Sequence, residues 1–214
     1  MRASTPPPFA YEGAWSVEHA TLPGGAPAYT GTIAVRRAAR AYLLDWDITA
    51  GRYVGVGLAR GDHLYVGCGE TFRQLGVALY YLDAGAPRGE WSAPELDGAV
   101  GSARFESPWG GSFEGDHRLV HTSPDGGAQP WDLEVRRAGE VYAITWRSGD
   151  ERRAGLGLPM PGGVAAGWYF DLQQLAVLDY AADQTRPDQL TAVWALGGFT
   201  ALGTEKLCRT GEAP

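Results

Sequence analysis

The stretch Ala41–Leu58, AYLLDWDITAGRYVGVGL, recurs one hundred positions later as Val141–Leu158, VYAITWRSGDERRAGLGL. The identical positions are Tyr42 and Tyr142, Trp46 and Trp146, Gly55 and Gly155, Gly57 and Gly157, and Leu58 and Leu158. An arginine pair before the stretch recurs too, as Arg36-Arg37 and Arg136-Arg137. A fixed spacing of this kind is the signature of internal duplication. We therefore interpret the chain as two copies of one unit.

The duplication covers nearly the whole chain. Tyr11 near the start corresponds to Phe113, and Trp91 near the end of the first copy corresponds to Trp194. We expect a disordered Ser/Thr/Pro-rich tail at 1–8, a first repeat at 9–107 and a second repeat at 113–210. Proline and glycine favour a linker at 108–112. The predicted organisation is one β-barrel per repeat.

Short runs of β-branched and aromatic residues, separated by glycine-rich turn signals, predict strands throughout. No segment has a sustained 3.6-residue apolar period with caps, so we expect almost no helix. In the first repeat the expected strands are Tyr11–His19, Tyr29–Arg37, Ala41–Ile48, Tyr53–Ala59, His63–Cys68, Leu75–Leu82, Gly89–Ala93 and Val100–Phe105.

Alternation along the third strand defines its inner face, because successive side chains of a strand point to opposite sides. Tyr42 and Trp46 share one face, and Asp45 and Asp47 lie on the other. The second copy keeps the same parity, which places the tyrosine and tryptophan face inside. In the fourth strand Gly55 and Gly57 share a face, which indicates a sharply coiled sheet.

The predicted fold class is therefore all-β. Two repeats of about eight antiparallel strands each favour two small up-and-down barrels, and eight strands enclose an interior that side chains fill or that holds one small ligand. The alternative is one larger structure in which the two sheets pack face to face or complete each other.

Composition and charge argue against some classes of function. The chain has 214 residues and a formal charge of −7 without a basic stripe, which argues against nucleic-acid binding. No run is apolar enough to span a bilayer, and residues 1–10 lack the apolar core of a signal peptide. If Met1 is the native start, we expect a cytoplasmic protein. Cys68 and Cys208 are expected to be free thiols, and a single bridge between them is the alternative.

Several short motifs in the two repeats resemble those of a known family. They include Tyr42-x3-Trp46, Gly55-Val56-Gly57-Leu58, Gly89-Glu90-Trp91 and the closing Gly203-Thr204-Glu205. Together these resemble an uncharacterised family of bacterial tandem repeats, sometimes loosely labelled fibronectin-binding. The Gly-x-Trp strand is also distantly similar to avidin and lipocalin strands. The first repeat departs from the pattern, with Ser102-Ala103 where the second has Thr204-Glu205. The resemblance implies a barrel but no catalytic residue.

No catalytic or metal-binding signature stands out. His117 and His121 would lie about 13 Å apart on one strand face, too far to share a metal. Asp62-His63 would be an acid/base pair, but the second copy has Gly162-Gly163 there, and turn chemistry is the favoured explanation of Asp62. The arginine pairs would hold an anion or lie solvated at turns. Glu205 is expected to pair with a nearby cation. We expect no cofactor.

The excess of aromatic residues supplies the remaining candidates. These side chains either fill the barrels or line a lumen mouth, where an indole N–H orients a ligand. The candidate ligand-binding residues are Tyr42, Trp46, Trp91, Tyr142, Trp146 and Trp194.

The sequence favours a non-catalytic binding or interaction protein, with a small apolar or aromatic ligand or a protein partner. The alternative is a small barrel-type isomerase or cyclase that uses an isolated carboxylate or tyrosine. A buried acid facing an open aromatic cavity would favour that enzyme.

Overall fold

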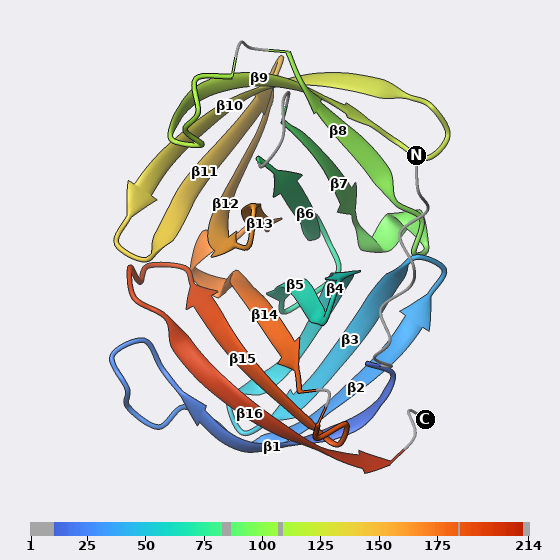
Figure 1. The fold of residues 1–214 in the computed structure, drawn as a ribbon, viewed down its shortest axis with the longest axis vertical. Coiled ribbons are helices and arrows are strands. Elements are labelled where there is room, and N and C mark those ends of the chain that lie inside the picture. Colours follow the sequence, from blue (N-terminus) through green and yellow to red (C-terminus); the bar gives the residue numbers. More distant parts are fainter. Residues whose placement is uncertain (1–10, 83–86, 107–108, 184, 212–214) are drawn as a thin grey trace.

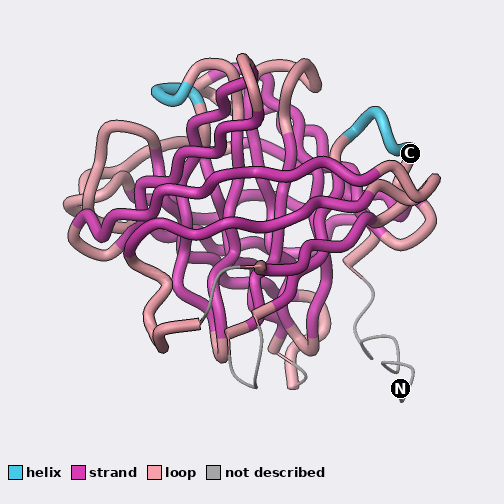
Figure 2. The backbone as a smooth tube through the Cα atoms, turned by 90° about the horizontal axis from the view of Figure 1, so that it is seen from above, coloured by secondary structure: helices cyan, strands magenta, loops and turns pink. Residues whose placement is uncertain are grey.

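The computed structural model describes residues 11–82, 87–106, 109–183 and 185–211, so the tail expected at 1–8 lies outside the described part. Most of the described chain is strand, joined by loops and turns, with two three-residue 3-10 turns, as the tube in Figure 2 shows. Almost no helix is present there, as predicted. The strands are β1 (Gly13–Thr21), β2 (Gly31–Ala38), β3 (Ala41–Ile48), β4 (Gly51–Arg60), β5 (His63–Gly69), β6 (Gly76–Tyr81), β7 (Arg88–Ser92), β8 (Gly101–Phe105), β9 (Gly115–Thr122), β10 (Ala128–Ala138), β11 (Val141–Ser148), β12 (Glu151–Met160), β13 (Gly163–Trp168), β14 (Ala176–Ala182), β15 (Gln189–Leu196) and β16 (Gly203–Gly211), and the 3-10 turns are η1 (Pro94–Leu96) and η2 (Leu172–Gln174).

The strands form two closed antiparallel barrels of eight strands each, stacked one above the other in Figure 1. Barrel I, the lower one, contains β1–β5 followed by β14–β16. Barrel II, the upper one, contains β6–β13 without interruption. The prediction of an all-β protein with two eight-stranded barrels is confirmed.

The expected correspondence between repeats and barrels is wrong. The last three strands of the first repeat, β6–β8, belong to barrel II, and the last three of the second repeat, β14–β16, belong to barrel I. The chain therefore crosses between barrels at 70–75 and again at 169–175. Of the linker expected at 108–112, residues 109–112 are described, and they lie between β8 and β9 of the same barrel. The two repeats complete each other's barrels, which was part of the alternative prediction.

The duplication itself allows this exchange. β6 and β14 carry matching residues, Val77 and Tyr80 in one and Val177 and Tyr180 in the other. The tyrosines point into the barrels and the valines into the layer between them, so either strand can present matching faces beside β5 or β13. In the structure β5 pairs with β14 and β13 pairs with β6. Sequence pattern alone does not distinguish these pairings from those within a repeat.

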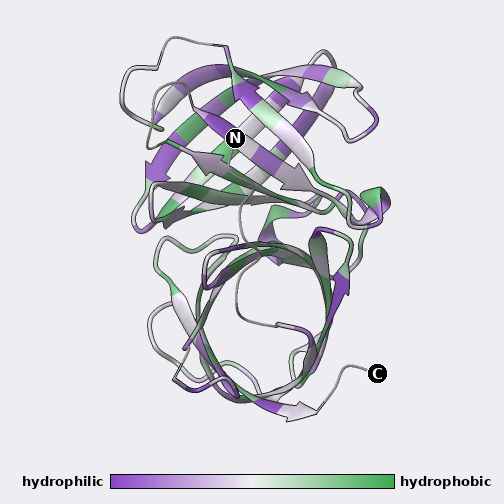
Figure 3. Ribbon diagram, turned by 45° about the vertical axis from the view of Figure 1, so that its right-hand side comes forward, coloured by the Kyte–Doolittle hydropathy of each residue, from purple (hydrophilic) through white to green (hydrophobic). Residues whose placement is uncertain are grey.

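Three apolar layers hold the molecule together. One fills barrel I, one fills barrel II, and the third lies between the two barrel walls. Figure 3 looks down the axis of barrel I and shows apolar stretches along its wall. Tyr42, Leu44 and Trp46 of β3 point into barrel I, as their parity predicts, while Leu43 belongs to the layer between the barrels.

The glycines of β4 and β12 make room for tryptophan rings. A Cβ atom at Gly55 would lie 2.8 Å from two ring atoms of Trp46, and one at Gly155 would lie 2.7 Å from the ring of Trp146. Contacts this short are impossible for a real side chain. The paired glycines therefore serve the packing of the inner aromatic face, in addition to any effect on sheet curvature.

Candidate functional site

Glu205 is a carboxyl group buried inside barrel I. Strand β16 turns Gly203, Glu205 and Leu207 inward, and Glu205 is only 2% exposed. The residues beside it on the neighbouring strands are small, Ala20 on β1 and Ala192 on β15. An ionisable group in this position is costly unless its oxygen atoms find partners.

Only one oxygen of this carboxyl group is satisfied. The Tyr180 hydroxyl donates a hydrogen bond of 2.7 Å to Oε2 of Glu205. No described residue forms a hydrogen bond with Oε1, which is shielded from solvent. The hydroxyl of Tyr29 also interacts with the carboxyl group, but without satisfying Oε1. The site therefore holds a buried acceptor that is open to a donor.

Burial sets the protonation of this group. It raises the pKa of Glu205 to about 7, against the opposing effect of the hydrogen bonds from Tyr180 and Tyr29. Burial, followed by the negative charge of Glu205, also raises the pKa of the Cys68 thiol. Near neutral pH the carboxyl is thus poised between its two forms, and the thiol is protonated.

An apolar cavity of about 250 Å³ opens at the end of barrel I where the β3–β4 turn and η2 lie, and Glu205 itself is not among its lining residues. Tyr29 and Cys68 line the cavity and are also neighbours of Glu205. A cavity of about 150 Å³ holds benzene. This one therefore has room for a single ring with a short substituent. Its principal lining side chains are Tyr29, Trp46, Tyr53, Cys68, Leu178 and Trp194.

Barrel II differs from barrel I at the positions that form the cavity. Across β4 and β12, Cys68 faces Gly55 and Trp168 faces Gly155, so Cys68 and Trp168 are equivalent. The Trp168 ring packs against Trp146, with centroids 5.9 Å apart. A cysteine thus leaves space in barrel I where a tryptophan fills barrel II.

An arginine closes barrel II further. Tyr53 of barrel I is replaced by Arg153, because Tyr53 pairs with Trp46 and Arg153 with Trp146. The guanidinium carbon of Arg153 lies 4.6 Å from the centroid of the Trp131 ring. A depression of about 330 Å³ remains at this mouth, and it is lined by Trp91, Trp131 and His121 together with polar and charged side chains such as Glu95, Gln129 and Arg153.

The polar group inside barrel II is an imidazole. At the position of Glu205 stands Ala103, and its partner across the strands is His121. Burial, followed by the charge of Arg153, lowers the pKa of His121 to about 3, so its ring is neutral. The Tyr80 hydroxyl accepts a hydrogen bond of 2.9 Å from the Trp146 indole and lies 3.3 Å from Nε2 of His121. Barrel II therefore has a packed, neutral interior.

The six predicted binding residues separate into three groups. Trp46 and Trp194 line the cavity of barrel I, and Trp91 lines the depression of barrel II. Trp146 is buried with its indole N–H bonded to Tyr80. Tyr42 and Tyr142 line neither space. They pack edge-on against Tyr11 and Phe113, with centroids 5.7 and 5.6 Å apart.

The sequence analysis did not place Glu205, Tyr29, Tyr180 or Cys68 among the candidate binding residues. The expectation that Glu205 pairs with a cation is wrong, because its hydrogen-bond partner is a tyrosine. Strand parity carried the missing signal: Gly203 and Leu207 are small or apolar and share a face with Glu205. Tyr180 and Glu205 lie on β14 and β16 at the end of the second repeat, and both pair with Ala192 of β15, so the pairing of these three strands brings them together.

Comparison with known proteins identifies no relative. No protein-family model matches the chain, and no curated protein or solved structure shows significant similarity to it. The candidate site therefore rests on geometry alone.

Other predicted sites are resolved by the structure. Both cysteines are free thiols, so the bridge between Cys68 and Cys208 is excluded. In the described residues no three potential ligands gather at a metal site, and no helix is long and apolar enough to cross a membrane. His63 lies 2.7 Å from Asp179 and 3.5 Å from Asp62, so its closer partner is the carboxylate of β14.

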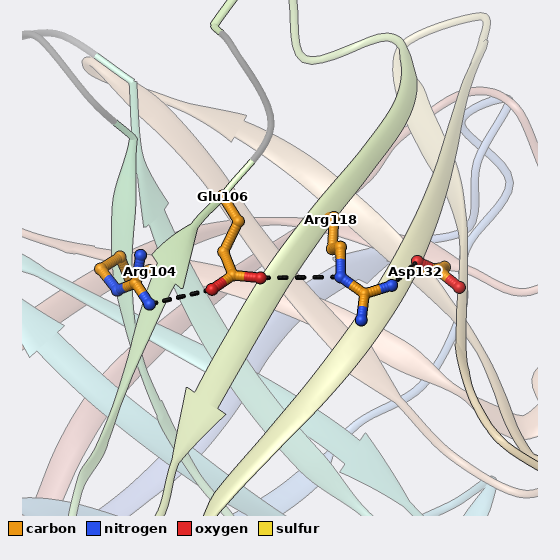
Figure 4. A network of polar contacts seen from close by, with 4 residues as sticks. All are labelled: Arg104, Glu106, Arg118 and Asp132. Carbon is orange, nitrogen blue, oxygen red and sulfur yellow. Dashed lines mark hydrogen bonds and ion pairs between the residues drawn. The ribbon is translucent and has the colours of Figure 1, made fainter.

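Charged side chains of barrel II form chains of contacts on its outer wall. Figure 4 shows Glu106 between Arg104, at 3.0 Å, and Arg118, at 3.6 Å, with Asp132 beyond. These side chains are substantially exposed, so each pair adds little stability. The arginine pairs of the repeats are exposed as well, which agrees with solvated turns.

Proposed function

We propose that the protein binds a small, mostly apolar ligand in the lumen of barrel I. The observation that carries this proposal is a buried carboxyl group with an unsatisfied oxygen beside an apolar, tryptophan-lined cavity. Barrel II folds with alanine at the same place, so the fold itself does not require the acid. Ligand sites are typically apolar with a few placed polar groups.

The distant similarity to avidin and lipocalin strands supports the same proposal, because eight-stranded barrels can hold one small ligand. We carry no activity over from the fibronectin-binding label. A protein partner for the outer surface stays a separate proposal.

A cavity-filling variant tests the proposal. In barrel II, Trp168 lies across from Gly76, where a Cβ atom would be 1.9 Å from the indole. The equivalent pair in barrel I is Cys68 and Ala176. The double variant C68W/A176G therefore copies the filled barrel into barrel I while avoiding that clash.

The probe is a panel of single-ring compounds, indole, phenol, aniline and benzylamine, titrated with tryptophan fluorescence and calorimetry. We expect saturable binding of at least one compound by the native protein and loss of that binding in C68W/A176G. The control is C208S, which changes a cysteine that does not line the cavity and should bind as the native protein does. Equal binding by C68W/A176G, or no binding by the native protein, would contradict the proposal.

The raised pKa of Glu205 favours a second candidate, an isomerase or cyclase in which this carboxyl transfers a proton. Its test is deuterium exchange from solvent into carbon positions of a ligand that the first experiment identifies. Exchange that is lost in E205Q supports the enzyme, and exchange at the uncatalysed rate in the native protein rejects it for that ligand.

A further inference from the structure

We propose that the ligand of barrel I is a ring-bearing organic base whose protonated nitrogen donates a hydrogen bond to Oε1 of Glu205. This inference rests on the proposed function and adds the chemical class of the ligand. The proposed route of the nitrogen from the cavity to the carboxyl group runs between Tyr29 and Cys68, which line the cavity and are neighbours of Glu205.

The chain supplies no cation of its own to this carboxyl group. The titratable side chains that face it are Tyr29, ahead of β2, Cys68 on β5 and Tyr180 on β14. On the two adjacent strands its partners are alanines. The neighbouring Lys206 points away and pairs with Glu18 at 3.0 Å. An ionised Glu205 is therefore a buried charge without a counter-ion among the described residues.

A cationic ligand satisfies both deficits at once. It donates to the oxygen that lacks a partner and it neutralises a charge in surroundings where Coulomb attraction is strong. A neutral alcohol or phenol supplies only the hydrogen bond. A carboxylate ligand would add a second negative charge and bring no donor.

The aromatic lining suits the same class of ligand. Tyr29 and Trp194 lie with their ring centroids 6.1 Å apart, and Trp46 lines the same cavity. Faces of tryptophan and tyrosine rings attract cations, and cages of aromatic side chains recognise ammonium groups. The volume of about 250 Å³ limits the base to one ring with a short arm.

Two isosteric probes test this inference. Benzylamine carries the cation, and benzyl alcohol has nearly the same shape with a neutral donor. At pH 7.5 we expect the native protein to bind benzylamine at least tenfold more tightly than benzyl alcohol. E205Q keeps the volume of the side chain and should lose that preference while its affinity for benzyl alcohol stays within about twofold, a margin well below the tenfold step of 1.4 kcal/mol.

A second variant guards against misfolding. E205A copies Ala103 of barrel II, so the fold already tolerates this residue at the equivalent place. It should also lose the preference for benzylamine. Near-UV circular dichroism checks that both variants keep native packing.

The outcomes separate this inference from the proposed function. Equal affinities for the two probes in the native protein, or a preference for benzylamine that survives in both E205Q and E205A, overturn the basic ligand and leave a lumen binder standing. If the native protein binds none of the single-ring compounds, or if C68W/A176G binds them equally well, both the inference and the proposed function are overturned.

Discussion

Glu205 is a carboxyl group enclosed by aromatic and small side chains, and its environment is unusual at the level of a single residue. Burial disfavours its charged form, while the hydroxyl of Tyr180 donates a hydrogen bond to it and that of Tyr29 also interacts with it. His121, which stands across from the equivalent alanine of barrel II, shows the opposite response, because burial disfavours a charged imidazole and lowers its pKa. The same physical cause therefore keeps both interiors close to neutral.

The stability of the protein should depend on pH through Glu205. Its pKa is about 7 in the folded protein, against an ordinary value of 4.5. The folded state thus binds the proton more tightly, so this contribution is fully present below about pH 4.5 and is lost as the pH rises through about 7. The difference corresponds to about 3 kcal/mol in the free energy of unfolding.

Chemical denaturation of the native protein and E205Q at pH values between 4 and 8.5 measures this loss. The native protein should lose stability relative to E205Q as the pH rises, because glutamine does not titrate and the other acids are common to both. Parallel curves for the two proteins would show that Glu205 is not buried as described.

At the scale of the element, a bulge in β1 distinguishes the two interiors. The register between β1 and β16 shifts between Val17 and His19, so His19 is exposed and Ala20 faces inward. Strand β9 pairs with β10 and β8 without a shift, and His121 faces inward. One extra residue in a strand thus exchanges a histidine for an alanine inside the barrel.

The packing role of Gly55 in β4 can be tested by substitution. Gly55→Ala should lower the free energy of unfolding by about 1–3 kcal/mol, because the added methyl group would overlap the Trp46 ring and the Val66 side chain. Thermal or urea denaturation measures this change. Gly110→Ala is the matched control, since a Cβ atom there would meet nothing within 4 Å. Equal effects of the two substitutions would refute the packing role of Gly55.

At the scale of the whole molecule, barrel II is inserted between β5 and β14 of barrel I. The two crossings bring the repeats together near Gly67 and Gly167, where a Cβ atom on Gly167 would lie 3.5 Å from the Cα atom of Gly67. Each repeat supplies five strands to one barrel and three to the other, so each barrel of this structure contains strands of both repeats.

Cross-linking tests this exchange of strands. His63 pairs with Ala181 across β5 and β14, whereas Tyr81, the residue equivalent to Ala181, pairs with Gly163. With Cys68 and Cys208 first replaced by alanine and serine, H63C/A181C should form a disulfide and H63C/Y81C should not.

A protease site inserted between Gly110 and Gly111 makes the result visible. After cleavage, H63C/A181C should run as one band on a non-reducing denaturing gel and as two bands after reduction. Bond formation in H63C/Y81C instead would show that each repeat closes its own barrel.

The sequence by itself determined the all-β class, the strand positions, the inward face of Trp46 and Trp146, and the presence of two barrels. Side-chain alternation and turn residues are local properties, so they can be read along one chain. Only the tertiary structure decided which strands pair, because β6 and β14 carry equivalent residues and either fits the same neighbours. For the same reason the site could not be predicted: Glu205 and Tyr180 belong to strands of the second repeat, and they approach Cys68 and the cavity of the first repeat only when both repeats close barrel I.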